Sequence, residues 1–337
     1  MIRFEKIGTD VEGMVAKVTD PKRIIPLRPG MVEGEKAHPY LISEYHNVGI
    51  QLDNVLFEVT FDPSHKADLF EERCAVAKRH VAGYLDNKGL VPHYKSSHWF
   101  EEEELLFPHA MVAGCEPDYP AIANEEPPVF NFDIFKVLRT GSGHLHFQLS
   151  EDVSRENIIQ YVRGLDQCIA AYLCTLHNDS DRRKLYGQAG RFRFKPDYPG
   201  FEYRTPDNYW FTQSSILAEP IFNAVKDMFD IQPNDSKWDK VNEYHTDMAK
   251  AINIGDITTV SALMELFDFP RLVDYVDPHL TGLLKSGTVP EKKVQNKLGT
   301  VQFFNASTSY YDMLDAATHA MPDEWWSPTE GTVHEDL

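Results

Sequence analysis

Gly143-His144-Leu145-His146-Phe147 is the stretch that decides the fold, because polar and apolar side chains alternate along it. Successive side chains of a β-strand point to opposite faces, so the two histidines share one face and the apolar residues share the other. Three further stretches carry chemically capable residues at positions i and i+2: Gly8-Thr9-Asp10-Val11-Glu12, Gly190-Arg191-Phe192-Arg193-Phe194 and Gly200-Phe201-Glu202-Tyr203-Arg204. A sheet built from these strands has one core face and one face that gathers carboxylates, imidazoles and guanidinium groups.

Two more carboxylates, Asp53 and Glu58, lie between Gly49 and Val59. Since they are five positions apart, they fall on opposite faces of an uninterrupted strand, and they reach one site only if Asn54 marks a turn or a bulge. Glu58 is the stronger candidate because it stands in an otherwise apolar run, where an unpaired carboxylate is costly.

The polar face predicted by these stretches suits phosphate chemistry. Carboxylates with one or two histidines are ligands for hard divalent cations such as Mg²⁺ or Mn²⁺, and arginines bind phosphate oxygens in pairs. The sequence contains neither a GxxxxGK[ST] loop nor a GxGxxG motif, so a P-loop or a Rossmann site is not supported. Each polar pair taken singly is also typical of a solvated sheet face, and it is their number that favours a shared site.

Apolar residues at helical spacing predict amphipathic helices that cover the core face of the sheet. Ala67, Phe70, Cys74 and Ala77 belong to one such stripe. The expected helices are residues 64–84, 154–177 with Ser154 as N-cap, 215–229, 238–252 and 258–266, the last beginning after Asp256.

Composition limits the class of protein. The 337 residues include 33 basic and 52 acidic side chains, for a net charge of −19, which argues against broad binding to nucleic acid. No stretch is apolar enough for a signal peptide or a membrane span. The four cysteines show no CxxC spacing, so neither a zinc cluster nor a disulfide framework is indicated. We therefore expect a cytoplasmic protein.

The stretches quoted above, together with Gly34-Glu35-Lys36, Gly114-Cys115-Glu116-Pro117-Asp118-Tyr119 and Tyr186-Gly187-Gln188-Ala189-Gly190, resemble the phage-encoded carboxylate–amine ligase family of the glutamine synthetase and glutamate–cysteine ligase superfamily. The resemblance implies an α+β fold: a curved antiparallel sheet of the glutamine synthetase catalytic-domain type, with amphipathic helices on its outer face. It covers roughly residues 8–211, and it implies a catalytic core at 1–211, a mainly helical region at 212–329 and an acidic tail at 330–337. Two residues depart from the family pattern, Gly13 after Glu12 and Ser142 where glycine is frequent.

The resemblance also implies roles by position. The metal ligands would be Asp10, Glu12, Asp53, Glu58, His144 and Glu202. Contacts to the phosphate or to an acyl phosphate would come from His146 and Arg204, and Glu202 would act in catalysis by completing the metal site beside the transferred phosphate. The ATP phosphates would be held by Lys36, Arg191, Arg193 and Arg204.

The reaction implied is ATP-dependent formation of an amide from a carboxylate and an amine, such as amino acids or peptides, through an acyl phosphate. Relatives often build shared sites across subunits, so the resemblance is compatible with a homo-oligomer. Two alternatives stay open: a zinc hydrolase that uses His144 and His146, and a non-catalytic phage binding or virion-associated protein that has kept the fold.

Overall fold

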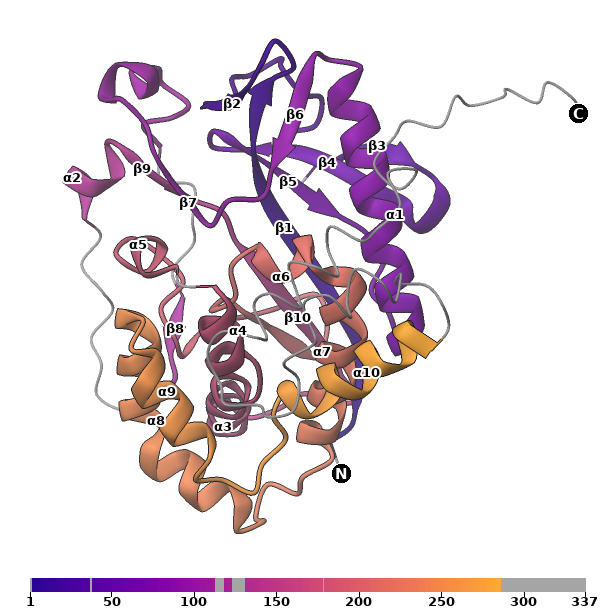
Figure 1. Cartoon of the computed structure of the whole chain (residues 1–337), viewed down its shortest axis with the longest axis vertical. Coiled ribbons are helices and arrows are strands. Elements are labelled where there is room, and N and C mark those ends of the chain that lie inside the picture. Colours follow the sequence, from indigo (N-terminus) through magenta and orange to yellow (C-terminus); the bar gives the residue numbers. More distant parts are fainter. Residues whose placement is uncertain (1, 37, 113–117, 123–130, 178, 286–337) are drawn as a thin grey trace, which may run out of the picture. The chain divides into compact units, whose positions relative to one another are not determined.

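One long strand, β1 (Phe4–Lys17), organises the sheet of the computed structural model. It pairs along one side with β10 (Gly143–Leu149) and along the other with β5 (Leu56–Thr60), and its last residues pair with β2 (Asp20–Ile25) and β6 (Leu90–His93). The remaining strands of this sheet are β3 (Tyr40–Ser43), β4 (Val48–Asp53), β8 (Tyr119–Pro120), β11 (Arg191–Phe194) and β12 (Gly200–Tyr203). All of these pairings are antiparallel, in the order β3-β4-β5-β1-β10-β12-β11-β8 (Figure 1).

The structure describes residues 2–36, 38–112, 118–122, 131–177 and 179–285. The chain divides into two compact units, Met1–Asp277 and Pro278–Leu337. The acidic tail predicted at 330–337 and most of the Gly114–Tyr119 stretch, including Cys115, lie outside the described residues.

The five helices expected from the sequence are present, together with others that were not predicted. Their bounds are α1 (Ala67–Asp86), α2 (Phe132–Phe135), α3 (Arg155–Leu165), α4 (Ala171–Leu176), α5 (Ser180–Arg183), α6 (Tyr209–Thr212), α7 (Ser214–Phe229), α8 (Lys237–Ile254), α9 (Ile257–Met264) and α10 (Val273–Lys285). A separate two-stranded sheet consists of β7 (Ser97–Trp99) and β9 (Leu138–Thr140). Among the described residues, no helix has the length and the apolar character that a membrane crossing requires.

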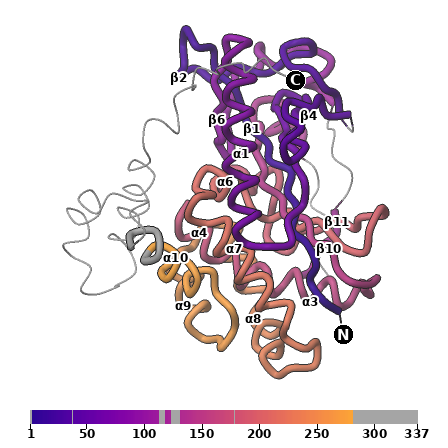
Figure 2. Tube along the Cα trace, turned by 90° about the vertical axis from the view of Figure 1, so that its right-hand side faces the viewer, coloured from indigo at the N-terminus to yellow at the C-terminus, as the bar shows by residue number. Residues whose placement is uncertain are grey.

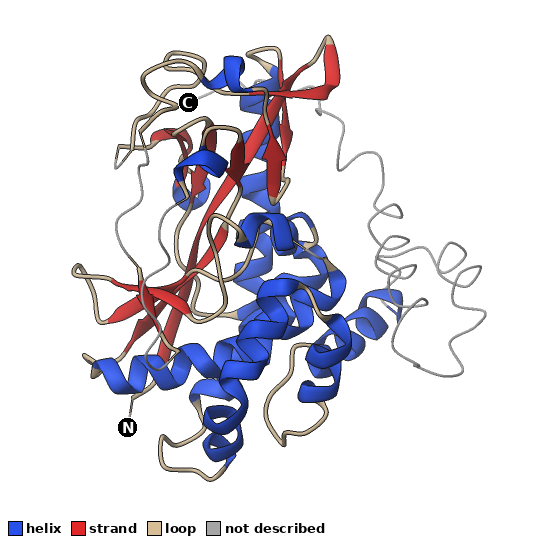
Figure 3. Ribbon diagram, turned by 90° about the vertical axis from the view of Figure 1, so that its left-hand side faces the viewer, coloured by secondary structure: helices blue, strands red, loops and turns tan. Residues whose placement is uncertain are grey.

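The apolar face of the sheet is the core of the first unit. Phe147 of β10 lies opposite Phe201 of β12, and both side chains are fully buried. Phe229, near the end of α7, packs on both, with ring centroids 5.6 Å and 6.4 Å away, and Tyr161 of α3 lies 4.8 Å from the same ring. The helices therefore cover one side of the strands (Figure 3). The other side is left to polar residues.

The helix ends confirm two of the predicted caps and show one difference. The side chain of Ser154 accepts a hydrogen bond from the backbone of Asn157, and Asp256 caps α9 in the same way. Helix α1 begins at Ala67 rather than at Ser64, because Ser64 exchanges two backbone hydrogen bonds with Ile7 of β1. Between α3 and α4 the expected helix continues through a π-helical turn, Asp166–Ala170.

The predicted antiparallel sheet with helices on one face is confirmed, whereas its assignment to the glutamine synthetase type stays a prediction, as does a boundary at residue 211. Helix α7, just beyond that boundary, packs against α1 and β1. Figure 2 shows α1 running beside β6, the strand that follows it in the chain.

The packing of a phenylalanine ring explains why position 13 is a glycine. Gly13 lies opposite Phe57 of β5, and a Cβ atom at this position would come within 2.2 Å of the ring of that phenylalanine. The ring thus covers the glycine, and β1 continues past it without a break to Lys17. The departure of Gly13 from the family pattern therefore leaves the strand intact.

Candidate active site

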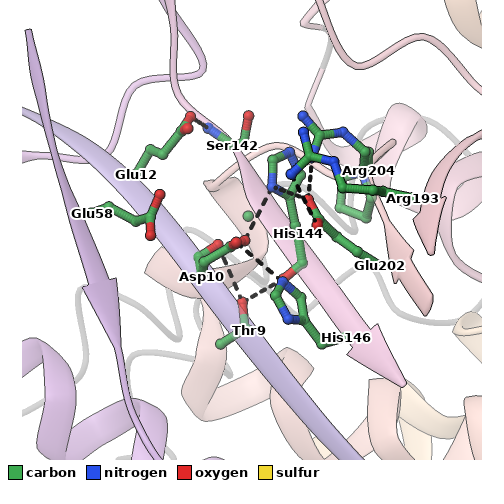
Figure 4. Close-up of polar contacts among 12 residues, drawn as sticks. Thr9, Asp10, Glu12, Glu58, Ser142, His144, His146, Arg193, Glu202 and Arg204 are labelled. Atoms are coloured by element: carbon green, nitrogen blue, oxygen red, sulfur yellow. Dashed lines mark hydrogen bonds and ion pairs between the residues drawn. The ribbon is translucent and has the colours of Figure 1, made fainter. Parts of the chain in front are cut away.

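The strand register brings the predicted polar pairs together on the face opposite the core. Asp10 of β1 lies opposite His144 of β10, and Glu12 lies opposite Glu58 of β5. On the next strand, Glu202 of β12 lies opposite His146. Residues from distant parts of the sequence thus meet across neighbouring strands (Figure 4).

One cluster, here called the histidine group, consists of Asp10, His144 and Glu202. Their ligand atoms all lie within 4.8 Å of one another. The Nδ1 atom of His144 is 3.0 Å from Oδ1 of Asp10 and 3.3 Å from Oε1 of Glu202. His146 lies beside the group, with Nε2 3.1 Å from Oδ2 of Asp10. This arrangement supplies two carboxylates and one imidazole at a single point.

A second cluster, the carboxylate group, consists of Glu12, Asp53 and Glu58, whose oxygens also lie within 4.8 Å of one another. The side-chain amide of Gln51 donates to Oε1 of Glu58 at 2.6 Å. The backbone N–H of Ser142 donates to Oε2 of Glu12 at 2.8 Å. Ser142, the other departure from the family pattern, thus contributes only a backbone group to this cluster.

Asn54 forms the turn that Asp53 and Glu58 need if they are to reach the same site. It joins β4 to β5 with a φ of 51°, a left-handed conformation that asparagine tolerates well. Its side-chain amide donates to the carbonyl oxygens of His109, Ala110 and Val112, and it accepts a hydrogen bond from Nε of buried Arg139 at 2.8 Å. The turn places Asp53 on the same face as Glu58.

The turn leads to a prediction about cation affinity. Asn54→Gly keeps the positive φ but removes the hydrogen bonds that hold Asp53 against its like-charged neighbours. We expect binding of Mn²⁺, measured by isothermal titration calorimetry, to weaken by about 10-fold, because partners one step outside a ligand typically contribute 10- to 100-fold. Asn47→Gly is the matched control, since Asn47 has a φ of 50° and its side-chain amide donates to Asp62, which is not a member of the carboxylate group. Equal Mn²⁺ affinity in the two variants would contradict the prediction.

Burial and mutual repulsion set the protonation of the carboxylate group. Burial, followed by the charges of Asp53 and Asp10, raises the pKa of Glu12 to about 7. Burial, with the charges of Asp10 and Glu12, raises the pKa of Glu58 well above its usual value. The raised pKa values mean that Glu12 and Glu58 ionise together readily only when a positive charge compensates their repulsion. A divalent cation is such a charge, and its binding would displace protons.

In the histidine group the pKa values of Asp10 and His144 are lowered, whereas those of Glu12 and Glu58 in the carboxylate group are raised. Burial alone would raise the pKa of Asp10, but the imidazoles of His146 and His144 outweigh it and hold that pKa well below its usual value. Burial lowers the pKa of His144 to about 4, with a contribution from the charge of Arg204. His144 is therefore neutral at pH 7, which is the form in which an imidazole binds a metal.

Cationic side chains surround Glu202 on the far side of the histidine group. Lys195 Nζ lies 2.7 Å and Arg193 Nη1 3.4 Å from its Oε2 atom, and Arg204 Nη1 contacts Oε1. Arg191 is 3.6 Å from Asp118, which also lies 3.8 Å from Arg204. Two of the predicted arginines, Arg193 and Arg204, thus contact Glu202 of the histidine group. The third, Arg191, contacts Asp118, which also lies beside Arg204.

Three residues of the site were not singled out from the sequence. Lys195 continues the alternation of Arg191 and Arg193 by one more step, and this was a signal that could have found it. Asp118 and Gln51 carried no pattern of their own. Lys36 lies 3.0 Å from both carboxylate oxygens of Asp53 in the carboxylate group, and its contact with phosphate stays a prediction.

The donor sets fit hard divalent cations. Carboxylate oxygens dominate both groups, and Mg²⁺ and Mn²⁺ prefer oxygen ligands, whereas Zn²⁺ favours histidine and cysteine. Buried polar atoms next to the groups also lack a hydrogen-bond partner within the described part of the chain, namely Nε2 of His144 and Oε1 of Gln51. Both atoms are of the kind that a cation or its bound water satisfies.

The fold and the site define a class of protein: an antiparallel sheet whose polar face holds two acidic clusters beside a set of arginines and lysines. Residues 134–265 match the sequence model of the family described as Phage phiEco32-like COOH.NH2 ligase-type 2. This match supports a carbon–nitrogen ligase. It spans less than half of the chain, and it includes β10, β11 and β12 but not the strands that carry Asp10, Glu12, Asp53 and Glu58.

The solved structures that resemble this chain at low sequence identity include a glutathione synthetase and two structures of GmaS. A bifunctional glutathione synthetase from Pasteurella multocida is 13% identical with a TM-score of 0.45, covering 94% of this chain and 52% of that one. GmaS with ADP is 10% identical with a TM-score of 0.35, covering 88% and 73%, and GmaS without ligand is 10% identical with a TM-score of 0.37, covering 90% and 73%. The chain thus spans about half of the glutathione synthetase. No curated protein matches the sequence.

Proposed function

We propose that this protein joins a carboxylate to an amine at the expense of ATP, through an acyl phosphate and with Mg²⁺ or Mn²⁺ bound at the two acidic clusters. The observation that carries the proposal is the convergence of both clusters with the arginines and Lys195 on one face of the sheet. Divalent cations beside arginines are the working parts of phosphoryl transfer. The family match supports the same class of reaction.

The clusters have separate tasks in this proposal. Glu12, Asp53 and Glu58 would hold one cation, and Asp10, His144 and Glu202 would hold another, so that phosphate oxygens are clamped between them. The cations supply charge neutralisation at the γ-phosphate. The residues of this chain orient them from adjacent strands, which is a rigid support for a site.

The guanidinium groups act on the transferred group. In the first step a carboxylate oxygen of the substrate attacks the γ-phosphorus and ADP leaves. In the second step the amine nitrogen attacks the acyl carbon, and phosphate leaves with one oxygen of the former carboxylate. Arg204 and Arg193, both beside Glu202, would hold the oxyanions that develop in these steps. His146, paired to Asp10, lies where it could contact the phosphate.

The proposed reaction is tested by ADP release. The protein is incubated with ATP, Mg²⁺ and a panel of amino acids and peptides as carboxylate and amine donors, and ADP and the amide product are measured. We expect release only when a carboxylate, an amine and a divalent cation are all present. With an ¹⁸O-labelled carboxylate, one labelled oxygen should appear in inorganic phosphate. Label-free phosphate with amide formation would contradict the acyl phosphate.

Metal analysis of the purified protein and binding measurements with Mn²⁺ and ATP separate the alternatives. A zinc hydrolase would retain Zn²⁺ through purification and would show no nucleotide turnover. A non-catalytic phage protein would bind neither Mn²⁺ nor ATP with measurable affinity. The dominance of carboxylates in both clusters favours the ligase over the zinc enzyme.

A further inference from the structure

Residues 184–190 connect α5 to β11 and are here called the arm, and Arg182 of α5 fixes the arm in place. The side chain of Arg182 is completely buried. Its guanidinium donates to the carbonyl oxygens of Thr205 at 2.7 Å and of Arg204 and Pro206 at 3.1 Å each, just beyond β12. It also donates to the carbonyl of Gly187 in the arm itself, at 3.3 Å. The arm is therefore tied to the strand end that carries Glu202 and Arg204.

Gly187 is required for this close approach. Its φ is 72°, in the left-handed region, and a Cβ atom would lie 2.0 Å from Nη1 of Arg182. The backbone N–H of Tyr186 also donates to the carbonyl of Arg182 at 2.8 Å. These contacts hold Tyr186 in one position relative to Arg204.

Tyr186 lies against two members of the candidate site. The guanidinium carbon of Arg204 is 4.7 Å from the centre of its ring, and the imidazole of His144 is 5.8 Å from it, centre to centre. Stacking on an aromatic ring holds the planar guanidinium group of an arginine in one orientation. The hydroxyl oxygen of Tyr186 is buried and has no hydrogen-bond partner among the described residues. A buried hydroxyl without a partner is costly, and beside an arginine it suits a bound anion.

We propose that Tyr186 is a further residue of the anion site: its ring orients Arg204, and its hydroxyl donates to the phosphate group that is transferred and released. The ligand class is a tetrahedral phosphate oxyanion next to the histidine group. This inference rests on the proposed ligase function and adds a contact to it. The stretch Tyr186-Gly187-Gln188-Ala189-Gly190, which had no role from the sequence, thereby acquires one.

Binding of inorganic phosphate tests the proposal without knowledge of the organic substrates. Phosphate is titrated into the full-length protein with Mg²⁺ and ADP present, and its Kd is measured by calorimetry. We expect Tyr186→Phe to keep the melting temperature and the affinity for ADP but to bind phosphate about 10-fold more weakly, the loss of one hydrogen bond to a charged group. Tyr186→Leu, which also removes the stacked ring, should bind phosphate more weakly still.

Tyr94→Phe is the matched control. The hydroxyl of Tyr94 is likewise buried without a partner in the described part of the chain, but its ring packs against Phe57 and Phe211 rather than against an arginine. This variant should bind phosphate as the wild-type protein does. Equal phosphate affinity in wild type and Tyr186→Phe would overturn the role of Tyr186 alone. Absence of phosphate binding by the wild-type protein would overturn both this proposal and the proposed function.

Discussion

Glu202→Gln should reduce ATP turnover by at least about 100-fold, since loss of partners even one step outside a metal ligand costs about 10- to 100-fold. Glu202 is completely buried, and the carboxylate that the change neutralises lies within contact distance of His144, Lys195 and Arg204. The amide keeps the volume of the side chain but has no negative charge. It would therefore bind a metal ion less well, and it would no longer hold the positive side chains of Lys195 and Arg204 in place. The measurement is the rate of ADP release under the conditions that give turnover in the wild-type protein.

The control for this change is Glu103→Gln. Glu103 is an exposed member of the Glu101–Glu104 run, so the variant has the same net charge as Glu202→Gln without touching the site. It should turn over ATP at the wild-type rate. Circular dichroism confirms that each variant is folded. Undiminished ADP release by folded Glu202→Gln would remove the catalytic role assigned to this residue.

Arg182→Met should lower the free energy of unfolding by about 3–5 kcal/mol, the cost of breaking a buried ion pair and its hydrogen bonds. Methionine fills much of the space but leaves the carbonyl oxygens of Arg204, Thr205 and Pro206 without their donor. It also leaves Asp179 with one cationic neighbour fewer, since Arg182 lies 3.6 Å from that carboxylate. Urea denaturation followed by fluorescence measures the change.

Lys184→Met provides the comparison. Lys184 also loses a positive charge, but its side chain is 52% exposed and its partner is the exposed Asp181. Surface changes of this kind usually stay within about 0.5 kcal/mol. A similar loss of stability in both variants would show that the carbonyl contacts of Arg182 contribute little, contrary to our expectation.

Alternation and helical spacing were sufficient to predict the elements that carry the site. The i, i+2 pairs of β1, β10, β11 and β12 lie on one face because a strand has a period of two, whatever its neighbours are. The sequence could not predict that α1 begins late, because the cause is a pair of hydrogen bonds between Ser64 and distant Ile7. The π-helical turn at Asp166–Ala170 also involves residues far away in the sequence. Its buried Asp166 accepts a hydrogen bond from the hydroxyl of Tyr203 and lies 2.8 Å from His245.

The site was predictable where a local pattern exists and not where tertiary contacts decide. The grouping of Asp53 with Glu58 depended on a turn at Asn54, and the hydrogen bonds that hold that turn come from residues 109–112 and Arg139. No local pattern indicated that Lys36, which was expected at the phosphates, forms an ion pair with Asp53. Tyr186 stood in a quoted stretch without a role, since only the fold shows that its ring faces Arg204.

The central place of β1 has a consequence for how the protein is made. Asp10 lies at the start of the chain, yet its partners His144 and Glu202 come from strands that are synthesised much later. Pairing over such sequence separations is slow, because the entropy of closing a long loop is lost before the contacts form. During translation β1 can pair early with β5 on one side, but the side that faces β10 stays open until residues 143–149 are made. An open, partly apolar strand edge is a site where nascent chains aggregate. The histidine group is complete only once β12 joins β10, so its three side chains come together at the end of folding rather than at its beginning.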